Sequence, residues 1–312
     1  EFKKNDRVVH KYFPVDVPHL AKKFVNYWKP IAAIFIDSEV WPNFIYEIKK
    51  NNTPLILLNA RITFKTLKRW KIFKKFSNKI FGSFDVCIAS SYESKKNLES
   101  LGIKKIKFFG NLKFIPSKKE IGDLDQSLKN TLDKRKVWLA SSTHDNEESF
   151  CVETHKKVKD SFNNALVIII PRHIFRIKDI YSKILKTNFK VQIINVGEKI
   201  EDNTDVALIN SFGELNKYYN YCKDVFIGKS LDKKNILTGG QNPIEAAKFG
   251  CKVYHGPYVY NFKEVYELLK SNKMSEEIFS SDELASKIVN SFNKKFEINP
   301  SSIEKINIFG KN

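Results

Sequence analysis

The chain has 312 residues, a length that suits two ordinary domains with apolar cores of their own. Its formal net charge is +19, and its basic residues are 48 lysines and six arginines. Because the lysines are scattered, with no arginine-rich run and no base-stacking motif, the composition argues against nucleic-acid binding. Two readings of the charge stay open: AT-rich codon usage, or attraction to phosphates and anionic membrane surfaces.

Cysteine spacing and hydropathy further limit the class of protein that the sequence can encode. Cys87, Cys151, Cys222 and Cys251 are far apart and form no Cys-x-x-Cys pair, so we expect buried, reduced thiols of a cytosolic protein. The longest apolar run, residues 165–170, has the length of a strand, well short of the roughly 20 residues that cross a bilayer. The chain begins at Glu1 inside a patterned run, so any membrane anchor is expected upstream.

Apolar runs alternate with segments of helical period in the first third of the chain. Strands are predicted at residues 8–13, 31–37, 55–59, 84–89 and 107–109, and helices at 19–28, 41–50, 67–79 and 93–101. This alternation is typical of a parallel α/β sheet. Residues 111–122, which contain a proline and several charges, are predicted to be a linker.

The same alternation starts again after the linker. Strands are predicted at 137–140, 166–170, 191–196, 206–209, 225–227 and 253–254, with helices at 127–133, 147–162, 177–186, 215–221, 243–249 and 262–271 and a closing helix at 282–292. We therefore expect an α/β protein with two Rossmann-like, doubly wound parallel sheets, in domains of residues 1–112 and 113–312. Ligands are expected at the carboxyl ends of the strands, in a cleft between the domains.

The segment TGGQNPIEAAKFG, residues 238–250, constrains the function most. It predicts a glycine-containing turn that opens a helix near Pro243, and the amides of such a turn can approach an anion. The helix dipole contributes only ~0.3–1 kcal/mol, whereas micromolar binding needs about 8 kcal/mol, so other groups must hold the ligand. Glu245 could accept both hydroxyls of a ribose. The alternative is an ordinary connection with a solvated glutamate.

Polar clusters follow the other predicted strands. They contain Glu39, Arg61, Ser142-Thr143-His144, Arg172-His173, Phe212-Gly213-Glu214 and Lys229-Ser230. Helix capping or a surface ion pair would explain any one of them, but six such clusters predict a binding site. Neither a nucleophile motif, nor a Walker lysine, nor metal-ligand spacing is present. The expected chemistry is the positioning of a nucleotide-bearing donor, with acid/base help from a carboxylate.

These clusters belong to a collinear series of motifs. The series is HKYFPVD, SEVWPN, LLNARIT, GNLKF, LASSTHDNEE, IIPRH, FGEL, FIGKSL, GGQNPIEAA and GPYVYNF. Over nearly the whole chain it resembles the 3-deoxy-D-manno-octulosonic acid (Kdo) transferases of lipopolysaccharide synthesis. The resemblance implies a GT-B fold and inverting transfer of Kdo from CMP-Kdo to a lipid A precursor. It also implies a reaction without metal or other cofactor, at the cytoplasmic face of the inner membrane of a Gram-negative bacterium.

The resemblance also implies roles for single residues. CMP-Kdo would contact Ser142, Thr143, His144, Arg172, His173, Phe212, Gly213, Glu214, Ser230, Gly240, Gln241, Asn242 and Glu245, while Glu39 and Arg61 would serve catalysis on the acceptor side. The general base would be a glutamate upstream of Glu1, so this chain is expected to bind CMP but to transfer Kdo poorly. Gln241 and Lys229 depart from the family, which usually has histidine and glycine there.

Two alternatives stay open. A GT-B transferase or epimerase that uses a UDP-sugar would share the glycine-containing loop and the late glutamate. A basic nucleic-acid-binding protein would account for the charge, with a steep salt dependence as its signature.

Overall fold

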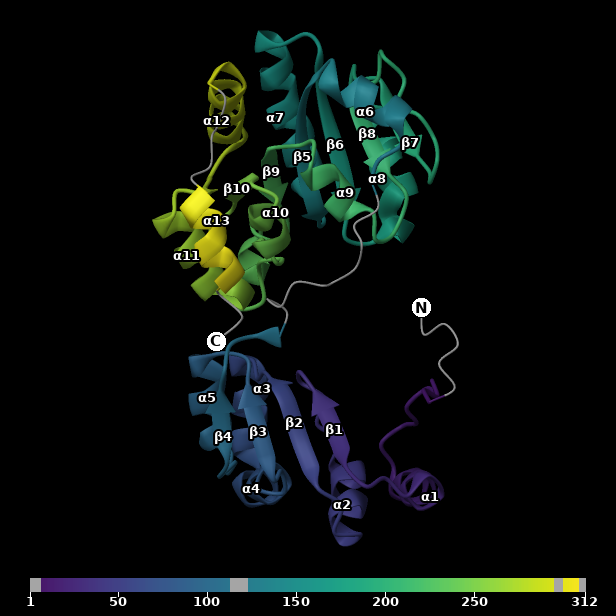
Figure 1. The fold of residues 1–312 in the computed structure, drawn as a ribbon, viewed down its shortest axis with the longest axis vertical. Helices are drawn as coiled ribbons and strands as arrows, with labels where there is room; N and C mark the ends of the chain where they lie inside the picture. Colours follow the sequence, from purple (N-terminus) through teal and green to yellow (C-terminus); the bar gives the residue numbers. More distant parts are fainter. Residues whose placement is uncertain (1–6, 113–122, 295–299, 309–312) are drawn as a thin grey trace. The chain divides into compact units, whose positions relative to one another are not determined.

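A computed structural model describes residues 7–112, 123–294 and 300–308 (Figure 1). The chain divides into two compact units, one within residues 1–115 and the other within residues 116–309. The predicted domain boundary at residue 112 adjoins a segment, 113–122, that lies outside the described residues, as does most of the predicted linker.

The first unit is a four-stranded parallel sheet with the order β1-β2-β3-β4. Its strands are β1 (Ala33–Ile36), β2 (Leu55–Ala60), β3 (Val86–Ala89) and β4 (Ile106–Phe108). Its helices are α1 (Pro18–Trp28), α2 (Pro42–Lys50), α3 (Phe64–Ile72), α4 (Lys74–Phe81) and α5 (Tyr92–Glu99). The prediction of a parallel α/β sheet is confirmed.

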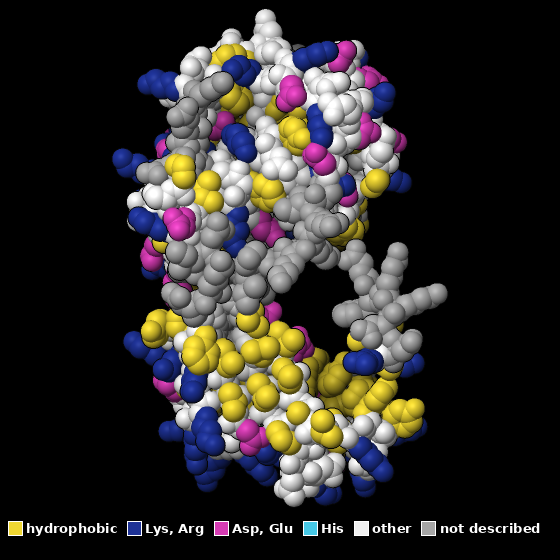
Figure 2. Space-filling model, viewed as in Figure 1, with side chains coloured by type: hydrophobic (Ala, Val, Ile, Leu, Met, Phe, Trp, Pro, Cys, Tyr) yellow, Lys and Arg dark blue, Asp and Glu magenta, His cyan; other side chains and the backbone are white. Residues whose placement is uncertain are grey.

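The core of the first unit lies on one face of this sheet. Successive side chains of a strand point to opposite faces, and Phe35 and Leu57 point into a core that the helices complete. Ile34 and Ile36, on the other face of β1, are 57% and 52% exposed. Figure 2 shows hydrophobic side chains gathered on the visible face of this unit.

Two predictions for the first unit are wrong. Residues 8–13 form no strand: Val8, Val9 and Tyr12 are exposed, and Phe13 packs instead against Phe44, with 4.2 Å between ring centroids. The single helix predicted at 67–79 is two helices, α3 and α4, because Phe73 between them has non-helical backbone angles of −106° and 56°.

The second unit is a seven-stranded parallel sheet with the order β11-β10-β9-β5-β6-β8-β7. Its strands are β5 (Lys136–Thr143), β6 (Ala165–Pro171), β7 (Val191–Ile194), β8 (Val206–Ile209), β9 (Asp224–Ile227), β10 (Lys252–His255) and β11 (Ser275–Glu277). Its α-helices are α6 (Gln126–Asp133), α7 (Glu147–Ser161), α8 (Ile177–Ile184), α9 (Leu215–Tyr219), α10 (Ile244–Lys248), α11 (Lys263–Ser271), α12 (Ser281–Asn293) and α13 (Pro300–Ile308). The sequence did not predict β11. The expectation that the helix at 282–292 closes the fold is wrong, because α13 follows it.

The strand order of the second unit reverses at β5. This strand comes first in the chain yet lies at the centre, with β9 on one side and β6 on the other. Val167 and Ile169 of β6 are completely buried, because helices cover both faces of a parallel sheet. Ligands of open α/β sheets bind outside the carboxyl ends of the strands at such a reversal. The loops after β5 and β9 are therefore where a site is expected.

The cysteines of the chain are free and buried, as predicted. Burial raises the pKa of the Cys87 thiol to about 12. Within the described ranges, none of the helices combines the length and the apolar character that a membrane crossing requires.

Candidate functional site

One buried carboxylate joins the loops after β5 and β9. Glu147, at the start of α7, is 2% exposed. Its oxygens accept backbone N–H groups from His144 at 2.9 Å, Lys229 at 2.7 Å, Ser230 at 2.8 Å and Leu231 at 3.2 Å. Burial raises the pKa of Glu147, although the four backbone donors act in the opposite direction. This residue therefore holds the two loops of the strand reversal in one arrangement.

Close packing of the backbone reinforces that arrangement. A Cβ on Gly228 would lie 2.5 Å from the carbonyl oxygen of Ser142 and 2.6 Å from Glu147 Oε2. The hydroxyl of Ser230 donates to the Ile227 carbonyl at 2.8 Å and accepts the Gly256 N–H at 2.9 Å. Ser230, a predicted ligand residue, thus uses its buried hydroxyl to shape the loop.

Residues from three predicted clusters meet at this edge. Gln241 Nε2 donates to His144 Nε2 at 3.1 Å, and the rings of His144 and His173 meet edge to face with 5.5 Å between their centroids. Burial, helped by the nearby Lys229 charge, lowers the pKa of His144 to about 4. The imidazole is therefore neutral at pH 7 and can accept the proton of the Gln241 amide.

Arg172 and Glu245 present charges to solvent near these groups. The Arg172 N–H donates to the Thr143 carbonyl at 3.0 Å, which places Arg172 beside the β5 loop, and Glu245 lies in the first turn of α10. Both side chains are exposed, and neither forms an ion pair or a hydrogen bond with the part of the chain that the structure describes. A guanidinium suits a phosphate, and a carboxylate suits ribose hydroxyls.

The segment that carries Glu245 is fixed by its neighbours. Asn242 Oδ1 accepts the Ile244 N–H at 3.0 Å, and the Tyr266 hydroxyl donates to the Gln241 carbonyl at 3.0 Å. The Gly240 N–H donates to the Lys229 carbonyl at 2.7 Å, so this segment also joins the loop after β9. The predicted anion-binding turn therefore lies beside His144, although α10 has only five residues.

Two further predicted residues have unusual surroundings. Thr143 Oγ1 is buried and has no hydrogen-bond partner among the residues with described positions, and Ser142 has a φ of 54°. Lys229 has a φ of 60°, in the left-handed region that glycine adopts without strain. This angle gives a physical reason for the glycine that the resemblance leads us to expect at position 229.

The cluster after β8 is more open. Phe212 is 77% exposed, Gly213 has a φ of 82°, and Glu214, just before α9, pairs with Lys217 of that helix at 2.6 Å. A cavity of about 220 Å³ is lined by Glu214 together with Ser211 and other residues. Glu214 is thus paired with a lysine of its own segment, whereas the ring of Phe212 is exposed to solvent.

In the first unit, Glu39 and Arg61 lie on neighbouring loops after β1 and β2. The Arg61 N–H donates to the Asp37 carbonyl at 3.1 Å, and the Ser38 hydroxyl donates to the Arg61 carbonyl at 2.9 Å. The indole of Trp41 donates to Glu39 Oε2 at 2.8 Å. The loops after β1 and β2 therefore contact each other, whereas the cleft between the two domains stays a prediction.

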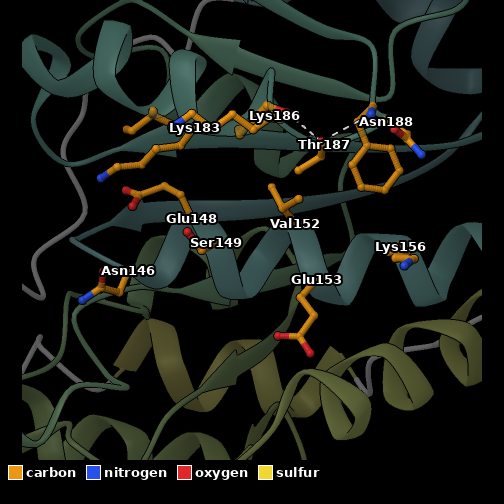
Figure 3. A pocket seen from close by; sticks show the side chains of 13 residues that line it. Asn146, Glu148, Ser149, Val152, Glu153, Lys156, Lys183, Lys186, Thr187 and Asn188 are labelled. Carbon is orange, nitrogen blue, oxygen red and sulfur yellow. Dashed lines mark hydrogen bonds between the residues drawn. The ribbon is translucent and has the colours of Figure 1, made fainter.

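A larger cavity, of about 500 Å³, lies between α7 and α8 (Figure 3). Val152, Ile180 and Phe189 contribute apolar side chains to its lining, and Lys156 and Lys183 contribute basic ones. Its lining includes none of the predicted ligand residues. Cavity size alone therefore does not indicate the site that the strand reversal predicts.

Sequence similarity identifies relatives of the chain. The family model described as 3-deoxy-D-manno-octulosonic-acid transferase (kdotransferase) matches residues 1–115. A 3-deoxy-D-manno-octulosonic acid transferase of Haemophilus influenzae is 30% identical over 269 residues, which cover 85% of this chain and 62% of that protein. The Rickettsia felis protein of the same name is 30% identical over 281 residues, or 90% of this chain and 59% of that protein. The chain thus spans about three fifths of the length of these relatives.

Solved structures share the fold. The C-terminal CMP-Kdo binding domain of WaaA from Acinetobacter baumannii matches 60% of this chain and 93% of its own length, with a TM-score of 0.50 and 22% identity. Anabaena Alr3699/HepE in complex with UDP matches 94% of this chain and 77% of its own length, with a TM-score of 0.56 and 12% identity. At these identities the matches establish the fold alone, α/β of the GT-B type. The sequence matches go further, and by them the chain belongs to the Kdo transferase family.

Proposed function

We propose that the chain is part of an inverting glycosyltransferase that moves Kdo from CMP-Kdo to a lipid A precursor. The observation that carries the proposal is 30% identity, over 85–90% of this chain, to proteins named as these transferases. The Acinetobacter domain named for CMP-Kdo binding supports it through a shared fold. UDP-bound relatives share the fold at only 12% identity, which favours the CMP-sugar.

The donor would bind at the carboxyl edge of the second unit. Arg172 would pair with the CMP phosphate, and Glu245 would accept the ribose hydroxyls, since neither side chain is occupied by a described ion pair or hydrogen bond. His144 and Gln241 would line the same site through their mutual hydrogen bond. Glu147 would act as a positioning residue that keeps the two loops together.

The reaction needs one bond to form and one to break. An acceptor hydroxyl oxygen would bond to the anomeric carbon of Kdo, while the bond from that carbon to the phosphate oxygen breaks and CMP leaves with the electron pair. Arg172 would offset the charge that develops on the phosphate. The hydroxyl proton would pass to a carboxylate base. Glu39 and Arg61 would lie on the acceptor side of the reaction.

The acceptor is itself a lipid, so we propose that the protein acts at an anionic membrane face, the cytoplasmic side of the inner membrane. The formal net charge of +19 suits such a surface. We propose no role for nucleic acid.

Nucleotide binding tests the proposal directly. We expect calorimetric titration of the 312-residue chain to show CMP binding, with UMP and UDP weaker. Loss of a hydrogen bond to a charged group costs about 1.5–3 kcal/mol, so Glu245→Ala should weaken CMP binding roughly 10- to 100-fold. Glu201→Ala, at an exposed glutamate after β7, is the control and should leave the affinity unchanged.

Two results would count against the proposal. Preference for UDP over CMP would favour a UDP-sugar enzyme of the same fold. Absence of binding to all three nucleotides, in a sample that unfolds cooperatively, would contradict the proposal that the second unit holds a donor site.

A further inference from the structure

The α3–α4 segment, residues 64–81, concentrates positive charge. It contains seven basic residues and no acidic one. The seven are Lys65, Lys68, Arg69, Lys71, Lys74, Lys75 and Lys79, and every one of them is exposed. In Figure 2, dark-blue side chains gather at the edge of the first unit where Figure 1 labels α4.

These charges are not neutralised by neighbouring acids. None of the seven forms an ion pair within the described ranges. Lys68 and Lys79 instead lie over the rings of Phe64 and Tyr46, at 4.6 and 5.7 Å from the ring centroids. Lysines elsewhere do find carboxylates, as Lys49 does with Asp85 at 2.9 Å. Although the lysines of the chain as a whole are scattered, this segment holds an acid-free group of them without ion pairs among the described residues.

Large apolar side chains are exposed among these cations. Ile72, Phe73 and Phe76, at the junction of the two helices, are 72%, 66% and 49% exposed. The opposite side of the segment is anchored, because Leu67 and Phe81 are buried in the core of the unit. The segment therefore holds exposed apolar side chains, which form its apolar tip, together with exposed cations.

We infer that the α3–α4 segment is the surface by which the protein docks on an anionic lipid bilayer. Cations of such a segment attract the headgroups, while Phe and Ile side chains enter the boundary between headgroups and acyl chains. An apolar tip of aliphatic and aromatic side chains fits a lipid better than the hydrophilic backbone of a nucleic acid. The inference deepens the proposed function, on which its membrane location rests, by naming the surface that meets the membrane.

Vesicle co-sedimentation of the 312-residue chain tests this assignment. We expect binding to phosphatidylcholine vesicles that contain phosphatidylglycerol and much weaker binding to phosphatidylcholine alone. Each cation near such a surface is worth about 1 kcal/mol, so Lys68→Gln/Lys71→Gln/Lys75→Gln should weaken binding on the order of 100-fold. Ile72→Ser/Phe73→Ser should weaken it about tenfold or more without any change of charge.

A matched triple variant provides the control. Lys156→Gln/Lys178→Gln/Lys186→Gln removes the same charge from exposed, unpaired lysines of the second unit and should change vesicle binding only a few-fold. Equal losses in the two triple variants would overturn the inference, as would equal binding to both kinds of vesicle. Binding to duplex DNA that is tighter than to vesicles, and is lost with Lys68, Lys71 and Lys75, would reassign the surface to nucleic acid.

CMP titration of the same α3–α4 variants separates this inference from the proposed function. We expect them to keep CMP binding and a cooperative unfolding transition, since the segment lies in the first unit. Vesicle binding by a wild-type chain that binds no CMP would reject the donor site and leave the docking surface standing.

Discussion

Gly228 occupies a position where a single methyl group would disturb the candidate donor site. Its added Cβ would meet the Ser142 carbonyl oxygen at 2.5 Å and Glu147 Oε2 at 2.6 Å. Neither atom can move away easily, because Ser142 lies within the central strand β5 and Glu147 is held by four backbone N–H groups. The loop after β9 is therefore built around a carboxylate from another element.

We expect Gly228→Ala to lower the free energy of unfolding by about 2–4 kcal/mol, since overpacking and displacement of a buried carboxylate act together. It should also weaken CMP binding, because both loops must shift. Urea unfolding measures the first effect and calorimetry the second. Gly197→Ala is the comparison: it introduces backbone strain, because the φ of Gly197 is 84°, but no clash, because its Cβ would meet nothing within 4 Å. That variant should lose only about 1–2 kcal/mol and keep CMP affinity; similar losses in both variants would contradict the steric argument.

At the scale of elements, α13 supports the short helix that carries Glu245. α10 is a single five-residue helix with Ala246 and Ala247 buried, and α13 packs against it. Ile306 of α13 is only 1% exposed. A helix near the end of the chain thus completes the packing behind the candidate ribose-binding carboxylate.

We expect Ile306→Ala to destabilise the second unit by about 2–4 kcal/mol, the usual cost of emptying a buried aliphatic site. Because the cavity would open next to α10, CMP affinity should fall as well. Urea unfolding and CMP titration report the two effects. Lys305→Ala, at the adjacent exposed position, should alter neither. If Ile306→Ala loses stability but binds CMP normally, α13 stabilises the unit without positioning Glu245.

The elements differ in how far their sequences predict them. Buried strands such as β6 and β8 are continuous apolar runs, so they can be recognised from the sequence without knowledge of the fold. β11 was missed because its sequence, Ser-Glu-Glu, is polar and it pairs only at the edge of the sheet. Residues 8–13 have the composition of a strand, but pairing depends on a neighbouring strand, which a local pattern cannot supply.

The candidate site likewise has contacts that the sequence predicts and contacts that it does not. Strand ends predicted that His144, Arg172 and Gln241 would share one edge, because parallel strands end together. The bond from the His144 N–H to Glu147 joins residues only three apart, and it is of the kind that a helix-capping sequence suggests. The three bonds from residues 229–231 could not be predicted, since they depend on β5 and β9 being neighbours although far apart in sequence.

At the scale of the whole molecule, buried histidines couple folding to pH. Burial lowers the pKa of His144 to about 4, of His155 to about 3 and of His255 to about 4. His155 is completely buried, and its Nδ1 accepts the Trp138 indole N–H at 3.1 Å. Asp224 acts in the opposite sense, since burial raises its pKa to about 6. The three histidines belong to the second unit, so acid should act on that unit first.

The sign follows from proton binding. An unfolded histidine takes up a proton near pH 6.5, whereas folded His155 stays neutral down to about pH 3. Below about pH 6.5 the unfolded chain therefore binds more protons, and the stability that is complete above that pH is lost as the pH falls. Asp224, which binds its proton first in the folded state, offsets part of the loss contributed by the three histidines.

His155→Gln isolates one of these contributions. The Gln side-chain oxygen can still accept the Trp138 N–H, but it takes up no proton. Between about pH 7 and pH 5 we expect the wild-type chain to lose about 2 kcal/mol more unfolding free energy than the variant does. Urea titrations at the two pH values measure the difference, with His19→Gln, at an exposed position on α1, as the control that should follow the wild type. Parallel pH dependences of wild type and His155→Gln would show that His155 does not stay neutral in the folded state, and the acid sensitivity would then have to come from His144 and His255.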